Sequence, residues 1–338
     1  MNILFKKRNH VSSNRRLNRN VTIAGVVSLA VFVAVQIFSP KRPLPYAIEM
    51  INAARLMEKA IHIVGSEYEK SGLDIDETID PNHTGLVGPE NSELTTTLGH
   101  LEAKRTTTNP NMAGLIVHLL HQAGVTAGDT IAVGCSASFP ALMIATLAAA
   151  QAMAVHPVVI LSLGASSFGG TNVDFNLLSI YQLLLREGVF TIQLAAISLG
   201  GEKDIGQDFK PEIKERLLKQ IQASGIPCIY EPDLPKNVAA RMKIYQGNSS
   251  KGRIAAFVNV GGNYADLGTS ALVLEVKPGL NRTVTLPTKS ERGVLFEMAA
   301  QEVPCIHLLF IKGLAMEYGL PWDPMPLPKP GALELLNN

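Results

Sequence analysis

The sequence has few of the residues that carry well-known motifs. It contains three cysteines, Cys135, Cys228 and Cys305, and no CxxC pair. An odd number leaves at least one thiol unpaired within the chain, and all three lie in apolar stretches, so we expect small core residues. The patterns GxGxxG, GxxxxGK[ST] and HExxH are absent, which removes the sequence evidence for dinucleotide binding, phosphate-loop hydrolysis and zincin chemistry. We expect no metal and no cofactor.

Charge is also scarce, at 17% of residues, and it is unevenly distributed. Residues 1–19 hold six of the 30 basic residues and no acid, so the remainder has 24 basic against 29 acidic residues. A nucleic-acid-binding protein concentrates positive charge in its folded part, and this chain does not. The composition therefore argues against a nucleic-acid partner. With 46% hydrophobic residues the chain is long enough for one large or two modest domains.

Residues 21–38 form an uncharged run that has the length of a membrane span. Its only clearly polar members are Thr22, Ser28 and Gln36, and roughly 20 apolar residues cross a bilayer as a helix. Basic residues precede the run, so the positive-inside rule places residues 1–19 in the cytoplasm and the main body outside. We predict a single-pass anchor over residues 20–39 in the cell membrane. A cleaved signal peptide and a buried helix stay open as alternatives.

The rest of the chain alternates apolar strand-like runs with helix-like runs. Strands are expected at 130–133, 156–163, 191–198, 226–230, 253–260 and 305–310, with a hairpin over 271–276 and 282–286; helices are expected at 46–70, 110–122, 140–151, 177–187, 210–224, 234–246 and 289–301. This alternation predicts an α/β fold with a mostly parallel sheet and flanking helices. The expected organisation is a linker and helix (40–79), an extracytoplasmic α/β domain (80–320) and a proline-rich tail (321–338).

Glycine-rich turns follow four of the apolar strands, at Gly134, Gly164, Gly200 and Gly261. Right-handed crossovers bring such turns together at the carboxyl edge of a parallel sheet, where α/β proteins place their sites. The sequence therefore predicts a site at this edge.

The first of these turns reads G-C-S-A-S and resembles the nucleophile elbow G-x-S-x-G, with Ser138 in the place of the last glycine. In that interpretation Ser136 is the nucleophile. His307 is a candidate base, although no sequence spacing links it to Ser136. A second interpretation is carboxylate binding by Ser136, Ser138, Ser166 and Ser167 beside helix N-termini. A third is that small residues only allow tight packing. All three stay open at this point.

Residues 80–110 form a polar segment that is rich in threonine and glycine and shows no helix or strand period. Long irregular segments in compact domains are often functional. Its candidate binding residues are His83, His100, Lys104 and Arg105. The two histidines lack metal-ligand spacing.

The segment DPNHTGLVGPENSELTTTLGHLEAKRTTTNPN (80–111), followed by AVGCSASFPAL (132–142), resembles the poly-gamma-glutamate system protein family. Members of that family are membrane-anchored components found with the machinery for poly-γ-glutamate synthesis and export. The resemblance implies an accessory role in the biosynthesis or export of a capsule-type polymer, with the polymer or synthase subunits as partners. It assigns no catalytic residue. The alternative function, which follows from the serine turn, is an extracytoplasmic serine hydrolase or transferase that acts on γ-glutamyl amide bonds through Ser136.

Overall fold

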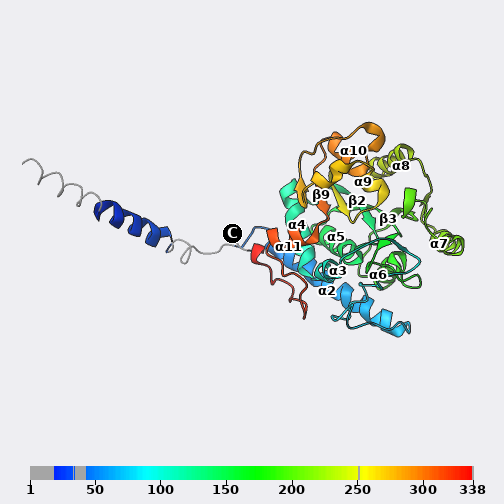
Figure 1. Ribbon diagram of the computed structural model, residues 1–338, viewed down its shortest axis with the longest axis horizontal. Helices are drawn as coiled ribbons and strands as arrows, with labels where there is room; N and C mark the ends of the chain where they lie inside the picture. The colour runs from blue at the N-terminus through cyan, green and yellow to red at the C-terminus, as the bar shows by residue number, and fades with distance from the viewer. Residues whose placement is uncertain (1–18, 33, 35–42, 250–251, 337–338) are drawn as a thin grey trace, which may run out of the picture. The chain divides into compact units, whose positions relative to one another are not determined.

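The computed structural model describes residues 19–32, 34, 43–249 and 252–336 (Figure 1). The chain divides into two units, one that contains Met1–Leu44 and one that spans Pro45–Leu336. In the first unit, residues 19–32 are helical. Among the described residues, no helix has both the length and the apolar character needed to cross a bilayer. The predicted anchor at 20–39 lies partly outside the described residues and stays a prediction.

The larger unit is built around a seven-stranded sheet with the order β6-β5-β3-β2-β7-β9-β8. The strands are β2 (Thr130–Ser136), β3 (His156–Ser162), β5 (Leu194–Ser198), β6 (Cys228–Ile229), β7 (Ile254–Val260), β8 (Gly279–Asn281) and β9 (Cys305–Leu308). All neighbours are parallel except β8 and β9. The predicted α/β class with a mostly parallel sheet is confirmed.

The chain starts this sheet at its centre and builds outward in both directions. From β2 it moves to β3, β5 and β6, and it then returns to the other side of β2 to add β7 and β9. The strand order therefore reverses between β2 and β7. In open α/β sheets the crevice at such a reversal, beyond the carboxyl ends of the strands, is where ligands bind.

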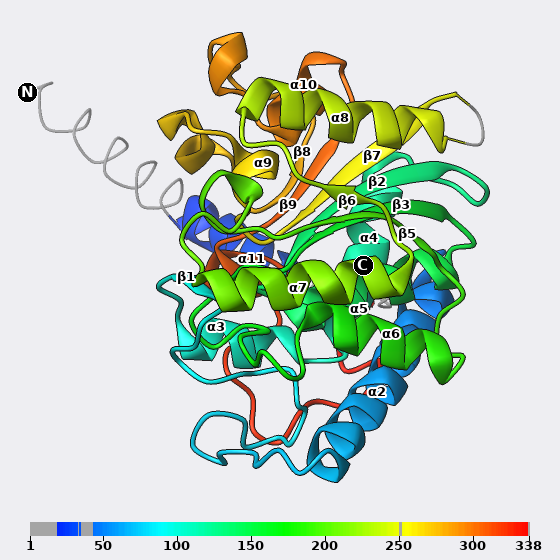
Figure 2. The same ribbon diagram turned by 90° about the vertical axis from the view of Figure 1, so that its right-hand side faces the viewer.

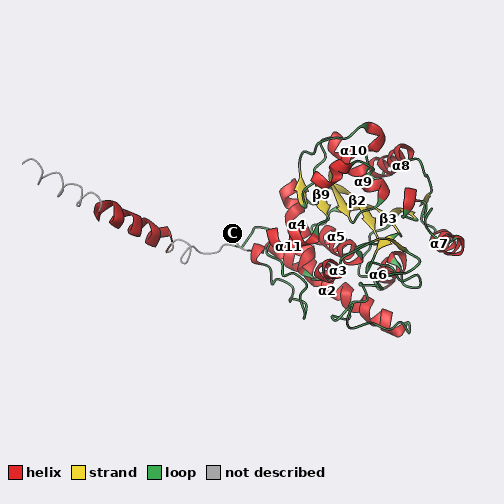
Figure 3. Cartoon of the chain, in the orientation of Figure 1, coloured by secondary structure: helices red, strands yellow, loops and turns green. Residues whose placement is uncertain are grey.

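Helices cover both faces of the sheet (Figures 2 and 3). One face carries α4 (Asn111–Ala123), α5 (Pro140–Ala152), α6 (Leu177–Arg186) and α7 (Pro211–Ser224), with α2 (Ala47–Lys70) packed on α4 and α5; the other carries α8 (Leu234–Gly247), α9 (Tyr264–Leu267) and α10 (Val294–Ala300). A last short helix, α11 (Ile311–Glu317), follows β9. The sheet is thus buried between two helical layers, which explains the continuous apolar runs of its central strands.

The central unit β2–α5 forms as its sequence predicts. Every residue of β2 is buried, and Pro140 occupies the first turn of α5, where its missing N–H costs nothing. Helix α5 is buried along nearly its whole length because α2 and α4 cover the side that turns away from the sheet. Its uniformly apolar composition follows from this position.

The predicted hairpin over 271–276 and 282–286 is wrong. Residues Ala271–Glu275 form a 3-10 helix, because the Ser270 side chain accepts a hydrogen bond from the N–H of Leu272 and starts a helical turn. Only β8 is extended, and it pairs antiparallel with β9. The predicted helix over 289–301 is also interrupted, because Arg292 and Gly293 are extended: residues Lys289–Glu291 form a 3-10 helix and α10 begins after Gly293.

Residues 80–110 contain more regular structure than the sequence indicates. Strand β1 (Thr95–Thr97) pairs with β4 (Ala165–Ser166), and α3 (Leu101–Thr107) follows. The tight turn after Asp80 is held by its carboxylate, which accepts hydrogen bonds from the N–H groups of Thr84 and Gly85. Pairing with β4 brings this segment to the carboxyl edge of the main sheet.

The proline-rich tail belongs to the same compact unit as the sheet. The Asn111 side chain donates to the carbonyl of Lys329, and the Thr106 hydroxyl accepts from the N–H of Asp323. Thr106 lies in the 80–110 segment and Asn111 follows it directly, so the tail lies against this segment.

The three cysteines are free thiols. Cys135 and Cys305 are core residues as expected, but Cys228 is exposed. The expectation for Cys228 is wrong because β6 is a two-residue strand at the sheet edge with one side open to solvent.

Candidate functional site

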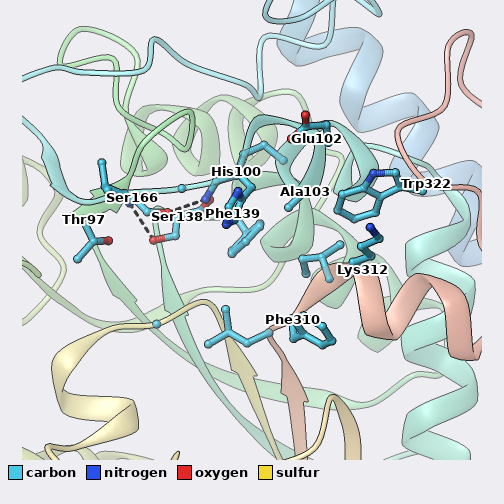
Figure 4. A pocket seen from close by; sticks show the side chains of 16 residues that line it. Thr97, His100, Glu102, Ala103, Ser138, Phe139, Ser166, Phe310, Lys312 and Trp322 are labelled. Carbon is cyan, nitrogen blue, oxygen red and sulfur yellow. Dashed lines mark hydrogen bonds between the residues drawn. The ribbon is translucent and has the colours of Figure 1, made fainter. Parts of the chain in front are cut away.

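A cavity of about 600 Å³ lies at the carboxyl edge of the sheet, where the strand order reverses between β2 and β7. Its volume is within the range of small-molecule sites. The walls come from six parts of the chain: residues between Thr97 and Lys104, the β2–α5 turn with Ser138 and Phe139, Ser166 of β4, Gly262 after β7, residues 309–312, and Trp322 in the tail. Figure 4 shows Trp322 and Lys312 on one side of this cavity and Thr97 and Ser166 on the other. We call it the switch-point pocket.

Lys104 is the most unusual group in the switch-point pocket. It is only 3% exposed, and its Nζ donates to the Ser166 hydroxyl at 2.6 Å and to the Ser138 carbonyl oxygen at 2.5 Å. The same nitrogen lies 3.7 Å from the centre of the Phe139 ring. No carboxylate within the described part of the chain forms an ion pair with it. Burial lowers the pKa of Lys104 to about 7.

Two of the predicted serines, Ser138 and Ser166, hold together the two segments that surround the Lys104 amine. The Ser138 hydroxyl accepts a hydrogen bond from the N–H of Ser166 at 3.0 Å, which joins the β2–α5 turn to β4. Figure 4 draws this bond as one of its dashed lines. The structure therefore brings together four of the sequence-predicted binding residues, Ser138, Ser166, Lys104 and the exposed His100, in one pocket.

The opposite wall was not foreseen from the sequence. Lys312 lies 5.8 Å from the Trp322 ring centre, and Phe310 exposes 70% of its surface with a left-handed backbone (φ 58°). A non-glycine residue in that conformation stores strain that often marks a functional position. Glu102 is the single acid of the lining. The one sequence signal for this wall is that the sole tryptophan of the chain stands in the proline-rich tail.

Ser136 is outside the pocket and is not placed as a nucleophile. It is 1% exposed, its hydroxyl has no hydrogen-bond partner within the described ranges, and Gly261 lies directly over it. Strand β2 continues through Ser136, so the residue that reaches the turn and the pocket is Ser138. A nucleophile elbow instead requires its serine in the turn itself.

The predicted base is also unsuited to that role. His307 is 4% exposed on β9, and its Nδ1 lies 3.1 Å from the side-chain nitrogen of Asn259. Burial lowers the pKa of His307 to about 4. The imidazole thus contacts Asn259, and no hydrogen bond joins it to Ser136.

The other predicted binding residues lie elsewhere. Ser167 is buried, and its N–H bonds to the carbonyl of Thr97. His83 lies between two carboxylates, 3.2 Å from Glu69 and 3.7 Å from Glu77. Arg105 pairs with Asp323 and so holds the tail. In the described ranges, no cluster of His, Cys, Asp and Glu has the arrangement of a metal site.

A buried charge cluster lies at the same edge of the sheet, and no sequence pattern indicates it. The Arg241 guanidinium of α8 donates to Asp204 at 2.7 Å and to Ser198 at 2.9 Å. It also lies 3.5 Å from Asp266, whose carboxylate packs on Gly134. Burial is the largest effect on Asp266 and raises its pKa to about 6. These groups do not line the switch-point pocket; they join α8 and α9 to the ends of the strands.

Comparison of the chain with protein families, with curated protein sequences and with solved structures finds no match.

Proposed function

We propose that this protein is a membrane-anchored accessory component of poly-γ-glutamate biosynthesis or export, and that its switch-point pocket binds a carboxylate-bearing chain. One observation carries the binding proposal: Lys104 is a buried amine that faces a pocket and has no acid partner among the described residues. A buried charge is costly unless an opposite charge pairs with it. An anionic ligand in the pocket supplies that charge.

The lining suits a γ-glutamyl chain. Each residue of that polymer carries one carboxylate and a short run of methylene groups in its backbone. Lys104 and Lys312 offer two cations, while Phe310 and Trp322 offer apolar surface to the methylenes. The residues after position 19 are acidic overall, which opposes unspecific attraction of a polyanion, so recognition rests on these local groups.

The membrane part of the proposal rests on residues 20–39 and on the basic residues before them. Its test is a pair of fusions after Leu44, one to a reporter that is active only outside the cytoplasm and one to a reporter active only inside. We expect activity from the first fusion alone. Activity from the second alone reverses the orientation and places the pocket away from an exported polymer.

The hydrolase alternative receives no support from the geometry, because Ser136 is covered by Gly261 and no described residue offers it a base within hydrogen-bond reach. Its direct test is Ser136→Ala with measurement of polymer length. We expect no change in length at equal protein levels.

The pocket proposal is tested with the fluorescence of Trp322, the sole tryptophan of the chain. Short γ-linked glutamate oligomers should change its emission in a saturable way, and the amide-capped oligomers without carboxylates should not. Lys104→Met should weaken binding about tenfold or more, because a charged hydrogen bond contributes about 1.5–3 kcal/mol. Lys219→Gln, on the exposed surface of α7, is the matched control. Equal affinity of Lys104→Met and the control would refute the proposal.

A further inference from the structure

We propose that the switch-point pocket also has a covalent activity: Lys104 acts as an amine nucleophile that forms an imine with a small 2-oxo acid. This goes beyond the proposed function, because it concerns a reaction with a carbonyl group and does not need the polymer.

The surroundings of Lys104 favour a reactive amine. Lysines become nucleophilic when they are desolvated in an apolar pocket, since only the neutral amine has a free electron pair. Here the Nζ lies against the Phe139 ring and is nearly free of solvent contact, and no acid in the part of the chain that the structure describes holds its proton. The lowered pKa of about 7 agrees with this geometry. The side chain still lines an open cavity, so a ligand can reach it.

Ser166 is placed to move the protons of such a reaction. Its hydroxyl lies 2.6 Å from the Nζ, and its own N–H is fixed to Ser138. The amine electron pair attacks the carbonyl carbon and forms a C–N bond, which gives a carbinolamine. Both amine hydrogens then leave with the former carbonyl oxygen as water, and a C=N bond remains. No oxidant or reductant takes part, and the Ser166 hydroxyl relays the protons.

The other wall of the pocket indicates the class of carbonyl compound. Lys312 is a second cation, whereas Glu102 is the single acid of the lining, so the ligand should carry an anionic group besides its carbonyl. Phe310 and Trp322 present ring surface on the same side (Figure 4), which suits an apolar substituent. A 2-oxo acid with an apolar side chain combines all three features.

The test traps the imine in the full-length protein. The protein is incubated at pH 7 with phenylpyruvate and cyanoborohydride, which reduces an imine to a stable amine, and the labelled lysine is found by peptide mass spectrometry. We expect one label per chain, at Lys104. Phenyllactate, which has the same carboxylate but no carbonyl group, should give none. Labels spread over surface lysines, with Lys104 no more labelled than Lys219, would overturn the inference.

Two variants separate this inference from polymer binding. Lys104→Arg keeps a positive charge and removes the nucleophile, so it should lose the label while it still binds γ-linked oligomers better than Lys104→Met. Ser166→Ala should slow labelling at least tenfold with Lys104 still in place. A wild-type rate of labelling in Ser166→Ala would remove the proton-relay role.

A measurement on the wild-type chain covers the case in which these variants fail to fold. The rate of labelling at Lys104 should rise with pH to a midpoint near 7, where the amine becomes neutral. Exposed lysines have an ordinary pKa of about 10.4 and should show no midpoint in that range. A Lys104 profile that coincides with that of the exposed lysines would overturn the inference.

Discussion

Two long cationic side chains are buried near the same edge of the sheet, and they differ in how their charge is compensated. Arg241 is surrounded by Asp204, Asp266 and serine hydroxyls, so its charge is paired inside the fold. Lys104 has only a hydroxyl, a carbonyl oxygen and an aromatic ring. Burial of a charge without an opposite partner favours the neutral form. The difference separates a structural cation from one that is available to a ligand.

The burial of Lys104 makes the stability of the unliganded protein depend on pH. The unfolded chain keeps this proton up to its ordinary pKa of about 10.5, whereas the folded chain releases it near 7. Between these values the unfolded state binds more protons, so the free energy of unfolding rises with pH, by up to about 1.4 kcal/mol per unit. Urea unfolding of the wild type and Lys104→Met at pH 7 and pH 9 should show this rise only in the wild type. Parallel pH profiles of the two proteins would contradict it.

Gly261 allows the loop after β7 to lie directly on Ser136. Its φ is +82°, and a Cβ there would lie 2.2 Å from the Ser136 hydroxyl oxygen. Gly261→Ala should therefore lower the free energy of unfolding by about 2–4 kcal/mol, from backbone strain and from the clash. Gly124 also has a positive φ, +89°, but open space surrounds it. Gly124→Ala should therefore cost only the backbone strain, about 1 kcal/mol.

A double-mutant cycle tests whether the additional loss of stability in Gly261→Ala comes from the clash with the Ser136 hydroxyl. In a Ser136→Ala background the oxygen is gone, and Gly261→Ala should cost only as much as Gly124→Ala. A cost that does not change between the two backgrounds would mean that Ser136 plays no part.

At the scale of elements, the carboxyl ends of the strands are held together by side chains of α8 and α9, which lie far from β2 and β3 in the sequence. Arg241 of α8 reaches Ser162 of β3 and Ser198 of β5, and Asp266 of α9 packs on Gly134 of β2. This cluster fixes α8 and α9 over the sheet, next to the loop that carries Gly262 into the pocket wall. The helices on this face therefore support the site without lining it.

Arg241→Met should lower the free energy of unfolding by about 3–5 kcal/mol, because it leaves two buried carboxylates without their counter-charge. Arg216→Met is the matched control, since Arg216 pairs with Asp174 on the exposed surface, and it should cost less than about 1 kcal/mol. Adding Asp204→Asn and Asp266→Asn to Arg241→Met should restore part of the loss. If the triple variant is less stable than Arg241→Met, the charge imbalance is not the cause.

At the scale of the whole molecule, Pro45–Leu336 forms one compact unit that includes α2 and the tail. Helix α2 packs on α4 and α5, and the tail is tied to α3 by Arg105 and Thr106. Segments from both ends of this unit thus cover the same helical layer. The pocket draws its walls from this unit alone.

A chain that begins at Pro45 should therefore fold by itself. We expect a single cooperative urea transition and the same affinity of its pocket for γ-linked glutamate oligomers as in the full chain. A chain that ends at Leu320 removes Trp322 and the partner of Arg105, so it should lose affinity even where it folds. Because this chain lacks the fluorescent tryptophan, its affinity is measured by titration calorimetry, alongside the full chain. Equal oligomer binding by this shorter chain would exclude the tail from the site.

The strand–helix alternation and the parallel sheet follow from local patterns of apolar residues and glycine turns, and the structure confirms them. A pocket also lies at the carboxyl edge where the glycine turns predict a site. Lys104, Ser138, Ser166 and His100 are also recognisable as candidates, since they are polar residues in irregular segments. The hairpin prediction fails because a capping serine outweighs the strand pattern after position 270. The interpretation of Ser136 as a nucleophile in the turn fails because the G-x-S-x-G pattern does not show at which residue β2 ends.

The sequence by itself determined the fold class and the edge at which to look, because periodicity and turn residues act over a few neighbouring positions. Only the tertiary structure decided which serine reaches the pocket, that Lys104 is buried without an acid, and that Trp322 and Lys312 form the facing wall. Arg241, Asp204 and Asp266 meet only there as well. Burial and charge pairing depend on segments as far apart in the sequence as Arg105 and Asp323, which are separated by 218 positions, so local patterns do not predict them.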